Sequence, residues 1–312
     1  MSKNNVVVLV GGVGGAKLAY GLARVLDADQ LTIIVNTGDD FWHYGLRICP
    51  DLDTVMYTLS DLVNRENGWG VAGESFNTLD ALRRYGDEAW FRLGDKDFAT
   101  HILRTQWWHE GKTLTEITKS LSFALDIGCT ILPMTDSLIE TKVKTAEYGE
   151  LPFQQYFVKY RWQPVVESLR LEGIAESTLS SEVKTALEQA DMIVFGPSNP
   201  WLSINPILSV LGMREALTAR DIPRVAVTPI VQGDAIKGPA AKMMKEWGYE
   251  VSASEVARYY GSVINGFIYD KRDKEFSVET LQFVAMDTIM DTYPKREKLA
   301  KEVLNWMEEL QI

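Results

Sequence analysis

Cysteine and histidine are scarce in this sequence, which has two residues of the first type and three of the second. Cys49 and Cys129 are too few for a disulfide framework or a cysteine-rich zinc site, and we expect both to be small buried hydrophobes. His43, His101 and His109 lack the spacing of metal ligands. The G-x-S-x-G motif of serine hydrolases is absent. No run reaches 18 apolar residues, so the sequence predicts no transmembrane helix and no membrane partner.

Basic residues are fewer than acidic residues in this sequence. Lysine and arginine number 32 against 43 aspartates and glutamates, which gives a net charge of −11. Nucleic acids and anionic membranes attract positive surfaces, so we expect no nucleic-acid partner. The first predicted strand begins after five residues, which leaves no room for a signal peptide, and we expect a cytoplasmic protein. Nine tryptophans and an acidic surface are compatible with a homodimer, but the sequence leaves the oligomeric state open.

Buried-type apolar runs alternate with helical patterns along much of the chain. This alternation predicts an α/β fold, a Rossmann-like doubly wound sheet of mostly parallel strands. The predicted strands are 6–10, 31–35, 192–196, 224–228 and 263–269. The predicted helices between them are 16–26, 53–63, 182–190, 207–218 and 239–247, with a closing helix at 293–310.

The middle of the chain follows a different pattern. Two helical segments (96–109 and 114–125) precede short alternating runs at 139–147 and 153–161. We therefore predict an α+β insertion or cap at 95–175, and assign 1–94 and 176–312 to the nucleotide-binding core.

Four glycines follow the first predicted strand and precede a helix: Gly11, Gly12, Gly14 and Gly15. Glycines at such a turn let backbone N–H groups approach an anion at the positive end of the helix dipole. A tight turn that binds nothing is the alternative. A dinucleotide-binding motif is not supported, because Lys17 stands where glycine or alanine is needed and Asn36 where an acid is expected. This argues against a nicotinamide-dependent oxidoreductase. The P-loop motif fails as well, at Ala16 and Leu18.

Carboxylates form a second group. Asp39 and Asp40 follow the second predicted strand, and Asp51 and Asp53 open the next helix. Beside bound phosphates, two such carboxylates suit Mg²⁺, and one could take a proton from an attacking hydroxyl. Asp51 has the alternative role of a helix N-cap.

Polar segments follow other strands, at the sheet edge where α/β proteins bind ligands. They contain Ser198 and Asn199, the segment 228–234, Lys237 with Gly238, and the pair at 265–266. The amide side chains could read a base or ribose, although proline-rich loops also serve as simple helix entries.

A further segment, Trp90 to Asp97, sets aromatic residues beside basic ones. Such a group could clamp a planar anionic ring. The alternative is a capped, solvated helix start with Asp95 or Asp97 as the cap.

Six ordered motifs between residues 6 and 245 closely resemble the 2-phospho-L-lactate transferases of deazaflavin coenzyme F-420 biosynthesis. They are GGVGGAK, NTGDD, PDLDT, LGDKD with H-x-x-R-T, PSNPxxSIxPI and PIVxGxAxKGP. The resemblance implies a Mg²⁺-dependent enzyme with a Rossmann-like core. It would transfer a phospholactyl-type group from a guanosine diphosphate ester to the ribityl hydroxyl of the deazaflavin precursor Fo, and GMP would leave. In some bacterial relatives the donor carries phosphoenolpyruvate, and the sequence does not decide between the two donors.

The resemblance also implies roles for residues. The four glycines and Lys17 would hold the donor's diphosphate, and Ser198, Asn199 and Lys237 would lie toward its guanosine. Asp53 and Arg92 would contact Fo, whose ring would lie against aromatic residues, namely Trp42, Trp90 and Phe91. The carboxylates that would bind Mg²⁺ or activate the hydroxyl are Asp39, Asp40, Asp51 and Asp53, in an order left open. A related family of non-catalytic nucleotide-sugar-binding regulators is the alternative.

Overall fold

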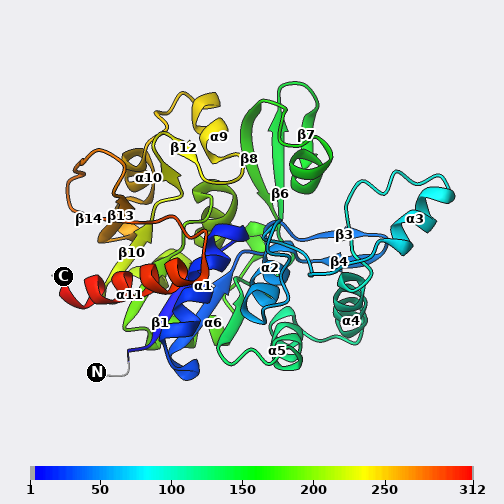
Figure 1. Ribbon diagram of the computed structural model, residues 1–312, viewed down its shortest axis with the longest axis horizontal. Coiled ribbons are helices and arrows are strands. Elements are labelled where there is room, and N and C mark those ends of the chain that lie inside the picture. Colours follow the sequence, from blue (N-terminus) through cyan, green and yellow to red (C-terminus); the bar gives the residue numbers. More distant parts are fainter. Residues whose placement is uncertain (1–3, 311–312) are drawn as a thin grey trace.

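The apolar runs of the sequence form a seven-stranded parallel sheet in the computed structural model, which describes residues 4–310 (Figure 1). Every pair of neighbouring strands is parallel. In spatial order the strands are β14 (Gln282–Met286), β13 (Gly266–Asp270), β10 (Arg224–Val227), β9 (Met192–Phe195), β1 (Val6–Val10), β2 (Leu31–Val35) and β5 (Thr130–Pro133). The fold class predicted from the sequence is therefore confirmed.

Helices cover both faces of the sheet, which is why β1 is buried at all five positions. Val8 of β1 packs into the core on one face, and its neighbour Leu9 packs into the core on the other. The first face is covered by α1 (Gly12–Val25), α2 (Pro50–Leu59), α5 (Leu114–Ala124) and α11 (Tyr293–Glu309). The second is covered by α6 (Ser181–Gln189), α7 (Asn205–Ser209), α8 (Met213–Thr218), α9 (Ala240–Glu246) and α10 (Ala253–Tyr260).

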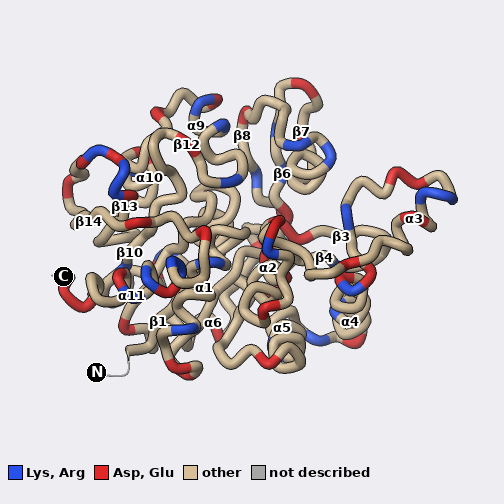
Figure 2. Tube along the Cα trace, viewed as in Figure 1, with Lys and Arg blue, Asp and Glu red and all other residues tan. Residues whose placement is uncertain are grey.

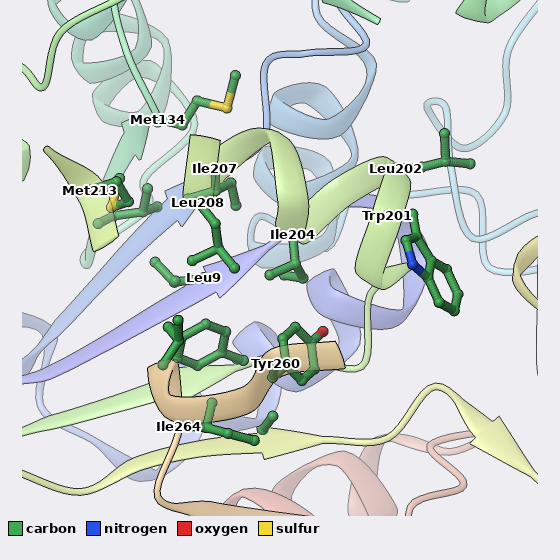
Figure 3. Packing of buried hydrophobic residues seen from close by; sticks show 14 of the residues in the cluster. Leu9, Met134, Trp201, Leu202, Ile204, Ile207, Leu208, Met213, Tyr260 and Ile264 are labelled. Carbon is green, nitrogen blue, oxygen red and sulfur yellow. The ribbon is translucent and has the colours of Figure 1, made fainter. Parts of the chain in front are cut away.

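Figure 3 shows the second core around Leu9. Ile204, Ile207 and Leu208 approach it from the segment that follows β9, and Tyr260 comes from the end of α10. Leu9, Ile204 and Ile207 are fully buried. This packing anchors the segment 197–209 against the sheet, and the segment thereby becomes a fixed wall at the carboxyl end of β1.

The chain changes direction across the sheet between β1 and β9. From β1 it proceeds to β2 and β5 on one side, then returns to β9 and continues to β14 on the other. Ligands of open α/β sheets bind in the crevice at such a point, outside the carboxyl ends of the strands. The segments that follow β1 and β9 are those that carry the glycines and Ser198.

Three smaller sheets and two helices complete the described structure. The three-stranded antiparallel sheet lies above the central sheet in Figure 1, and α3 with the β3–β4 hairpin lies at the far right. Their bounds are β6 (Glu140–Thr145), β7 (Gly149–Pro152), β8 (Val166–Glu172), β3 (Phe41–His43), β4 (Leu46–Ile48), β11 (Ile230–Val231), β12 (Asp234–Ala235), α3 (Asn77–Arg84) and α4 (Asp97–His109). No helix among residues 4–310 is long and apolar enough to cross a membrane.

Some predicted boundaries differ from the structure. The segment 95–175 is not a separate insertion throughout, because β5 pairs with β2 in the central sheet and α5 packs into its core. β5 has only four residues, which is too short a run to separate from its surroundings in the sequence. The single helix predicted at 207–218 is two helices, since Gly212 adopts a left-handed conformation (φ +85°) between them. Residues 155–159 form a π-helical turn and not a strand.

Candidate active site

The glycine-rich turn is packed against the protein itself. A Cβ atom on Gly14 would lie 2.4 Å from the carbonyl oxygen of Pro197, and one on Gly15 would lie 2.5 Å from Ser198 Oγ. Gly12, the first residue of α1, has φ +62°. The glycines are therefore required for the close approach of two loops, whether or not a ligand binds.

Two backbone donors of this turn already have protein partners. The N–H of Gly11 donates to Ser198 Oγ (3.0 Å), and the N–H of Gly12 donates to Asp51 Oδ1 (2.7 Å). The next two N–H groups, of Val13 and Gly14, belong to the first turn of α1, where no carbonyl precedes them within the helix. An anion at this helix start would be bound by these later donors, so phosphate binding by all four glycines stays a prediction.

Asp51 joins the glycine turn to the second strand. Its side chain accepts hydrogen bonds from Gly12 N and from Asn36 Nδ2 (2.9 Å), and Asn36 Oδ1 accepts from Gly38 N (2.9 Å). Burial raises the pKa of Asp51 to about 6, and the two hydrogen bonds oppose the rise. The N-cap of α2 is Cys49, so the alternative role of Asp51 as N-cap is wrong.

Asp39 and Asp40 are buried next to this group. Burial raises the pKa of Asp39 well above its ordinary value, and the charge of Asp51 raises it further. Burial also raises the pKa of Asp40 to about 7, although Arg47 opposes the rise. Asp39 Oδ1 and both carboxylate oxygens of Asp40 have no hydrogen-bond partner. Asp40 is thus a partly protonated acid near neutral pH with free lone pairs.

Arg47 supplies the positive charge nearest to Asp40. Its terminal nitrogen lies 3.6 Å from Asp40 Oδ2, and its guanidinium stacks on the ring of Trp108 at 4.0 Å from the centroid. The side chain is fully buried, and the backbone N–H of Arg47 donates to Thr105 Oγ1 (2.9 Å). The strand β4 and helix α4 thereby fix the charge beside the carboxylate.

Asp53 belongs to a separate buried network. Arg104 donates to both of its carboxylate oxygens, one of them at 3.1 Å. His101 lies between Asp53 (Nδ1 to Oδ2, 3.7 Å) and Asp97 (Nε2 to Oδ1, 3.3 Å), and Tyr57 donates to Asp97 Oδ1 at 2.7 Å. Burial opposes ionisation of Asp97, but hydrogen bonds from His101 and Tyr57 hold its pKa below the ordinary value. Because Arg104 neutralises Asp53, Asp40 is the better proton acceptor of the two predicted catalytic residues.

A pocket of about 210 Å³ adjoins this network. Its lining includes Asp97, Arg92, Trp69 and Phe76, and the Arg92 guanidinium lies 4.1 Å from the centroid of the Phe76 ring. Charge and aromatic surface therefore meet beside Asp97. A larger pocket, of about 390 Å³, lies between β14 and α11, and none of the predicted site residues lines it.

The predicted aromatic residues are divided between two places. Trp90 and Phe91 pack against each other (5.7 Å between centroids), and both pack against His43 of β3. Trp42 points to the opposite face of the same strand and lies near His109 of α4 (6.2 Å). The three aromatic side chains therefore do not form one surface.

The alternative of a capped helix start is wrong for Asp97, whose carboxylate faces His101. The backbone N–H groups of Lys96 and Asp97 donate to Glu74 instead (2.8 Å each). Asp95 accepts hydrogen bonds from the backbone of Asn77 and Thr78 (3.0 Å each), at the start of α3.

The polar loops after β9 and β10 lie at the crevice. Asn199 Oδ1 accepts from the backbone N–H groups of Trp201 (3.0 Å) and Leu202 (3.1 Å), so this oxygen caps the segment 200–204. Lys237 donates to the carbonyl of Asn67. The pair at 265–266 was predicted to follow a strand, but it lies at the opposite end of β13, where Asn265 accepts from Arg224 N (2.7 Å).

A divalent cation fits part of the acidic group. Among residues 4–310, one set of three or more His, Cys, Asp or Glu side chains places its ligand atoms within 4.8 Å of one another, and it consists of Asp53, Asp97 and His101. The predicted metal ligands Asp39, Asp40 and Asp51 do not form such a set. Asp39 and Asp51 nevertheless suit a cation, because their negative charges repel each other and Asp39 Oδ1 has no hydrogen-bond partner.

The side chains that organise these carboxylates are Asn36, Arg47, His101 and Arg104. The sequence indicated His101 and Arg104 only as basic residues that follow the aromatic segment 90–97, and it indicated no role for Asn36 or Arg47. A signal was present in the H-x-x-R-T motif, whose first and fourth residues lie on one face of a helix. His101 has a local partner acid in Asp97, four residues earlier, but the acid that Arg104 binds, Asp53, comes from α2.

Comparisons with known proteins identify the family of the chain. The family described as 2-phospho-L-lactate transferase CofD matches residues 6–307. The 2-phospho-L-lactate transferase of Methanosarcina mazei is 40% identical over 302 residues, which cover 96% of this chain and 99% of that protein. The phosphoenolpyruvate transferase of Streptomyces griseus is 39% identical over 314 residues, or 98% of this chain and 99% of the relative. A crystal structure of a UPF0052 family protein from Bacillus halodurans has a TM-score of 0.64 at 15% identity and covers 97% of this chain and 99% of its own, which is a likeness of fold.

Proposed function

Because the chain belongs to the 2-phospho-L-lactate transferase CofD family, we propose that it transfers a phospholactyl or enolpyruvyl-phosphate group from a guanosine diphosphate ester to the terminal ribityl hydroxyl of Fo. The hydroxyl oxygen forms a bond to the phosphorus that carries the organic acid. The bond between that phosphorus and the bridging oxygen breaks, and GMP leaves with the electron pair. The hydroxyl proton passes to a protein base.

The proposal depends chiefly on the surroundings of Asp40. This residue is a buried carboxylate with a pKa of about 7 whose oxygens accept no hydrogen bond, although Arg47 lies 3.6 Å from Oδ2. Its surroundings connect the two halves of the site, since Asp39 with Asp51 leads to the glycine turn and Arg47 leads to the Asp53 network. A general base with a pKa near the working pH suits attack by an alcohol. We assign Asp40 as this base.

The two halves bind different substrates in this proposal. The start of α1, Lys17 and Lys237 hold the donor diphosphate, and Ser198 with Asn199 lies toward its guanosine. Arg92 and the pocket at Asp97 receive the deazaflavin, and Asp53, to which Arg104 donates, is its polar contact. Asp39 and Asp51 would hold Mg²⁺, which when bound neutralises negative charge on the phosphates.

A two-substrate assay tests the proposal. The purified protein is supplied with Mg²⁺, Fo and each of the two guanosine diphosphate esters in turn, and GMP is followed by chromatography. We expect GMP only when Fo is present, together with a matching Fo-phosphodiester product. The ester that gives the higher kcat/KM identifies the donor.

Two outcomes would contradict the proposal. GMP release without Fo would indicate a hydrolase. Nucleotide binding with no product from either ester would favour the alternative of a non-catalytic nucleotide-sugar-binding regulator. Omission of Mg²⁺ tests the metal separately, and we expect turnover to require it.

A further inference from the structure

Four cationic side chains from separate parts of the chain influence one another near the start of α1. The positive charges of Arg296 and Lys237 both lower the pKa of Lys17, which burial lowers most, and Arg65 acts in the same way on Arg296. Lys237 donates to the carbonyl of Asn67, next to Gly68, whose Cβ would lie 2.7 Å from Val13 of α1 and 3.6 Å from Lys237 Nζ. Such a concentration of like charge is unusual in a chain of net charge −11.

These four cations have no acidic partner. Within residues 4–310, no carboxylate oxygen lies within 4.0 Å of Lys17, Arg65, Lys237 or Arg296. Asp291 raises the pKa of Lys17 and Asp61 raises that of Arg296, but each acid forms its ion pair elsewhere: Asp61 with Arg24 (3.2 Å) and Asp291 with Lys295 (2.8 Å). In Figure 2 positions of both signs lie along the junction of α1 and α11.

Arg296 is the least satisfied member of the group. Its Nε and one terminal nitrogen are buried and have no hydrogen-bond partner. The guanidinium lies over the rings of Tyr293 (4.4 Å) and Tyr20 (5.5 Å). Gly21 fixes its backbone, since a Cβ there would lie 2.2 Å from the Arg296 carbonyl oxygen. A buried, unpaired guanidinium is costly unless an anion completes it.

We propose that Arg296 is an anion-binding residue that, with Lys17 and Lys237, holds phosphate groups of the donor at the start of α1. The guanidinium is permanently charged, and its N–H donors suit phosphate oxygens. The closing helix α11 thus contributes a binding residue to a site that begins at residue 11. The identity of the ligand as a guanosine diphosphate ester rests on the proposed function, whereas the affinity for phosphate does not.

Calorimetry with three probes tests the role of Arg296. GDP, guanosine and inorganic pyrophosphate are titrated into the wild type, Arg296→Gln and the matched control Arg24→Gln. Arg24 also stacks on Tyr20 (5.0 Å), but it is paired with Asp61. We expect Arg296→Gln to lower the affinity for GDP and pyrophosphate at least about tenfold and to leave the affinity for guanosine unchanged. Arg24→Gln should bind all three as the wild type does.

Each other outcome has a defined meaning. The inference is overturned if Arg296→Gln and the wild type have equal affinity for GDP and pyrophosphate. It is also overturned if the affinity for guanosine falls as much as the affinities for GDP and pyrophosphate. If the wild type binds pyrophosphate through Arg296 but not GDP, the inference stands and the proposed donor fails. If the wild type does not bind pyrophosphate, the inference fails. Should Arg296→Gln not fold, Arg296→Lys retains the charge without the paired donors and should show an intermediate affinity.

Discussion

Replacement of Asp40 by asparagine should stabilise the folded protein in alkaline solution while it abolishes the reaction. The pKa of Asp40 rises from its ordinary value of 3.8 to about 7 on folding, chiefly through burial. The folded state therefore binds a proton more tightly than the unfolded state between these values, and the free energy of unfolding falls as the pH rises through this window. At about 1.4 kcal/mol per pH unit, the ionised carboxylate costs up to about 4 kcal/mol above pH 7.

Asparagine has the same shape and no charge, so Asp40→Asn removes this cost. We expect its free energy of unfolding in urea to exceed that of the wild type by up to about 4 kcal/mol at pH 8 and to match it near pH 4. Asp270→Asn is the control with the opposite sign. Burial opposes its ionisation, but hydrogen bonds from Arg272 and Thr288 outweigh burial and lower its pKa, so this variant should lose stability at pH 8 and less in acid.

An Asp40→Asn protein that is no more stable than the wild type at pH 8 would refute this reasoning. The same carboxylate predicts the kinetics. The kcat/KM of the wild type should fall about tenfold for each pH unit below about 7, and Asp40→Asn should lower kcat by about 10²–10⁴. A wild-type profile that stays flat between pH 5.5 and 8 would remove Asp40 as the base.

Three further predictions concern the rest of the site. Arg104→Gln leaves the Asp53 carboxylate buried and unpaired and should lower the free energy of unfolding by about 3–5 kcal/mol, and a loss below about 1 kcal/mol in urea denaturation would contradict the ion pair. Gly14→Ala places a Cβ 2.4 Å from a backbone carbonyl oxygen and should lower the affinity for GDP, measured by calorimetry, at least about tenfold. Gly128→Ala, whose Cβ would meet only a methyl group at 3.2 Å, should leave GDP affinity unchanged. Arg92→Ala should weaken the binding of Fo about tenfold in a fluorescence titration and leave the binding of GDP unaffected, and an equal loss of both would contradict a role of Arg92 that is specific to Fo.

The central sheet was largely predictable because its strands are buried on both faces. β1 and β9 are continuous apolar runs, β2 and β10 are nearly so, and such runs are visible without any long-range information. β14 was missed because only its last residue is buried. Its place at the sheet edge is set by pairing with β13, which local sequence does not encode.

The candidate site was predictable in its residue types and less so in its connections. The sequence indicated that glycines and carboxylates follow neighbouring strands, and the structure brings them together. The sequence did not indicate that the Asp51 carboxylate accepts a hydrogen bond from the N–H of Gly12, because these residues are 39 positions apart. The sequence also did not indicate which of Asp40 and Asp53 is the better proton acceptor. That distinction depends on their different partners, which are Arg47 for Asp40 and Arg104 for Asp53.

The first turn of α2 explains how one short segment serves both halves of the site. Asp51 and Asp53 are two residues apart, and at 3.6 residues per turn their side chains leave the helix about 200° apart. Asp51 consequently faces the start of α1, where it accepts from Gly12, and Asp53 faces α4, where Arg104 holds it. A shift of one residue in this helix would turn both carboxylates away from their partners. The relative position of the glycine turn and the Asp53 network is therefore set by one helical turn, which Pro50 begins and whose next residues are buried.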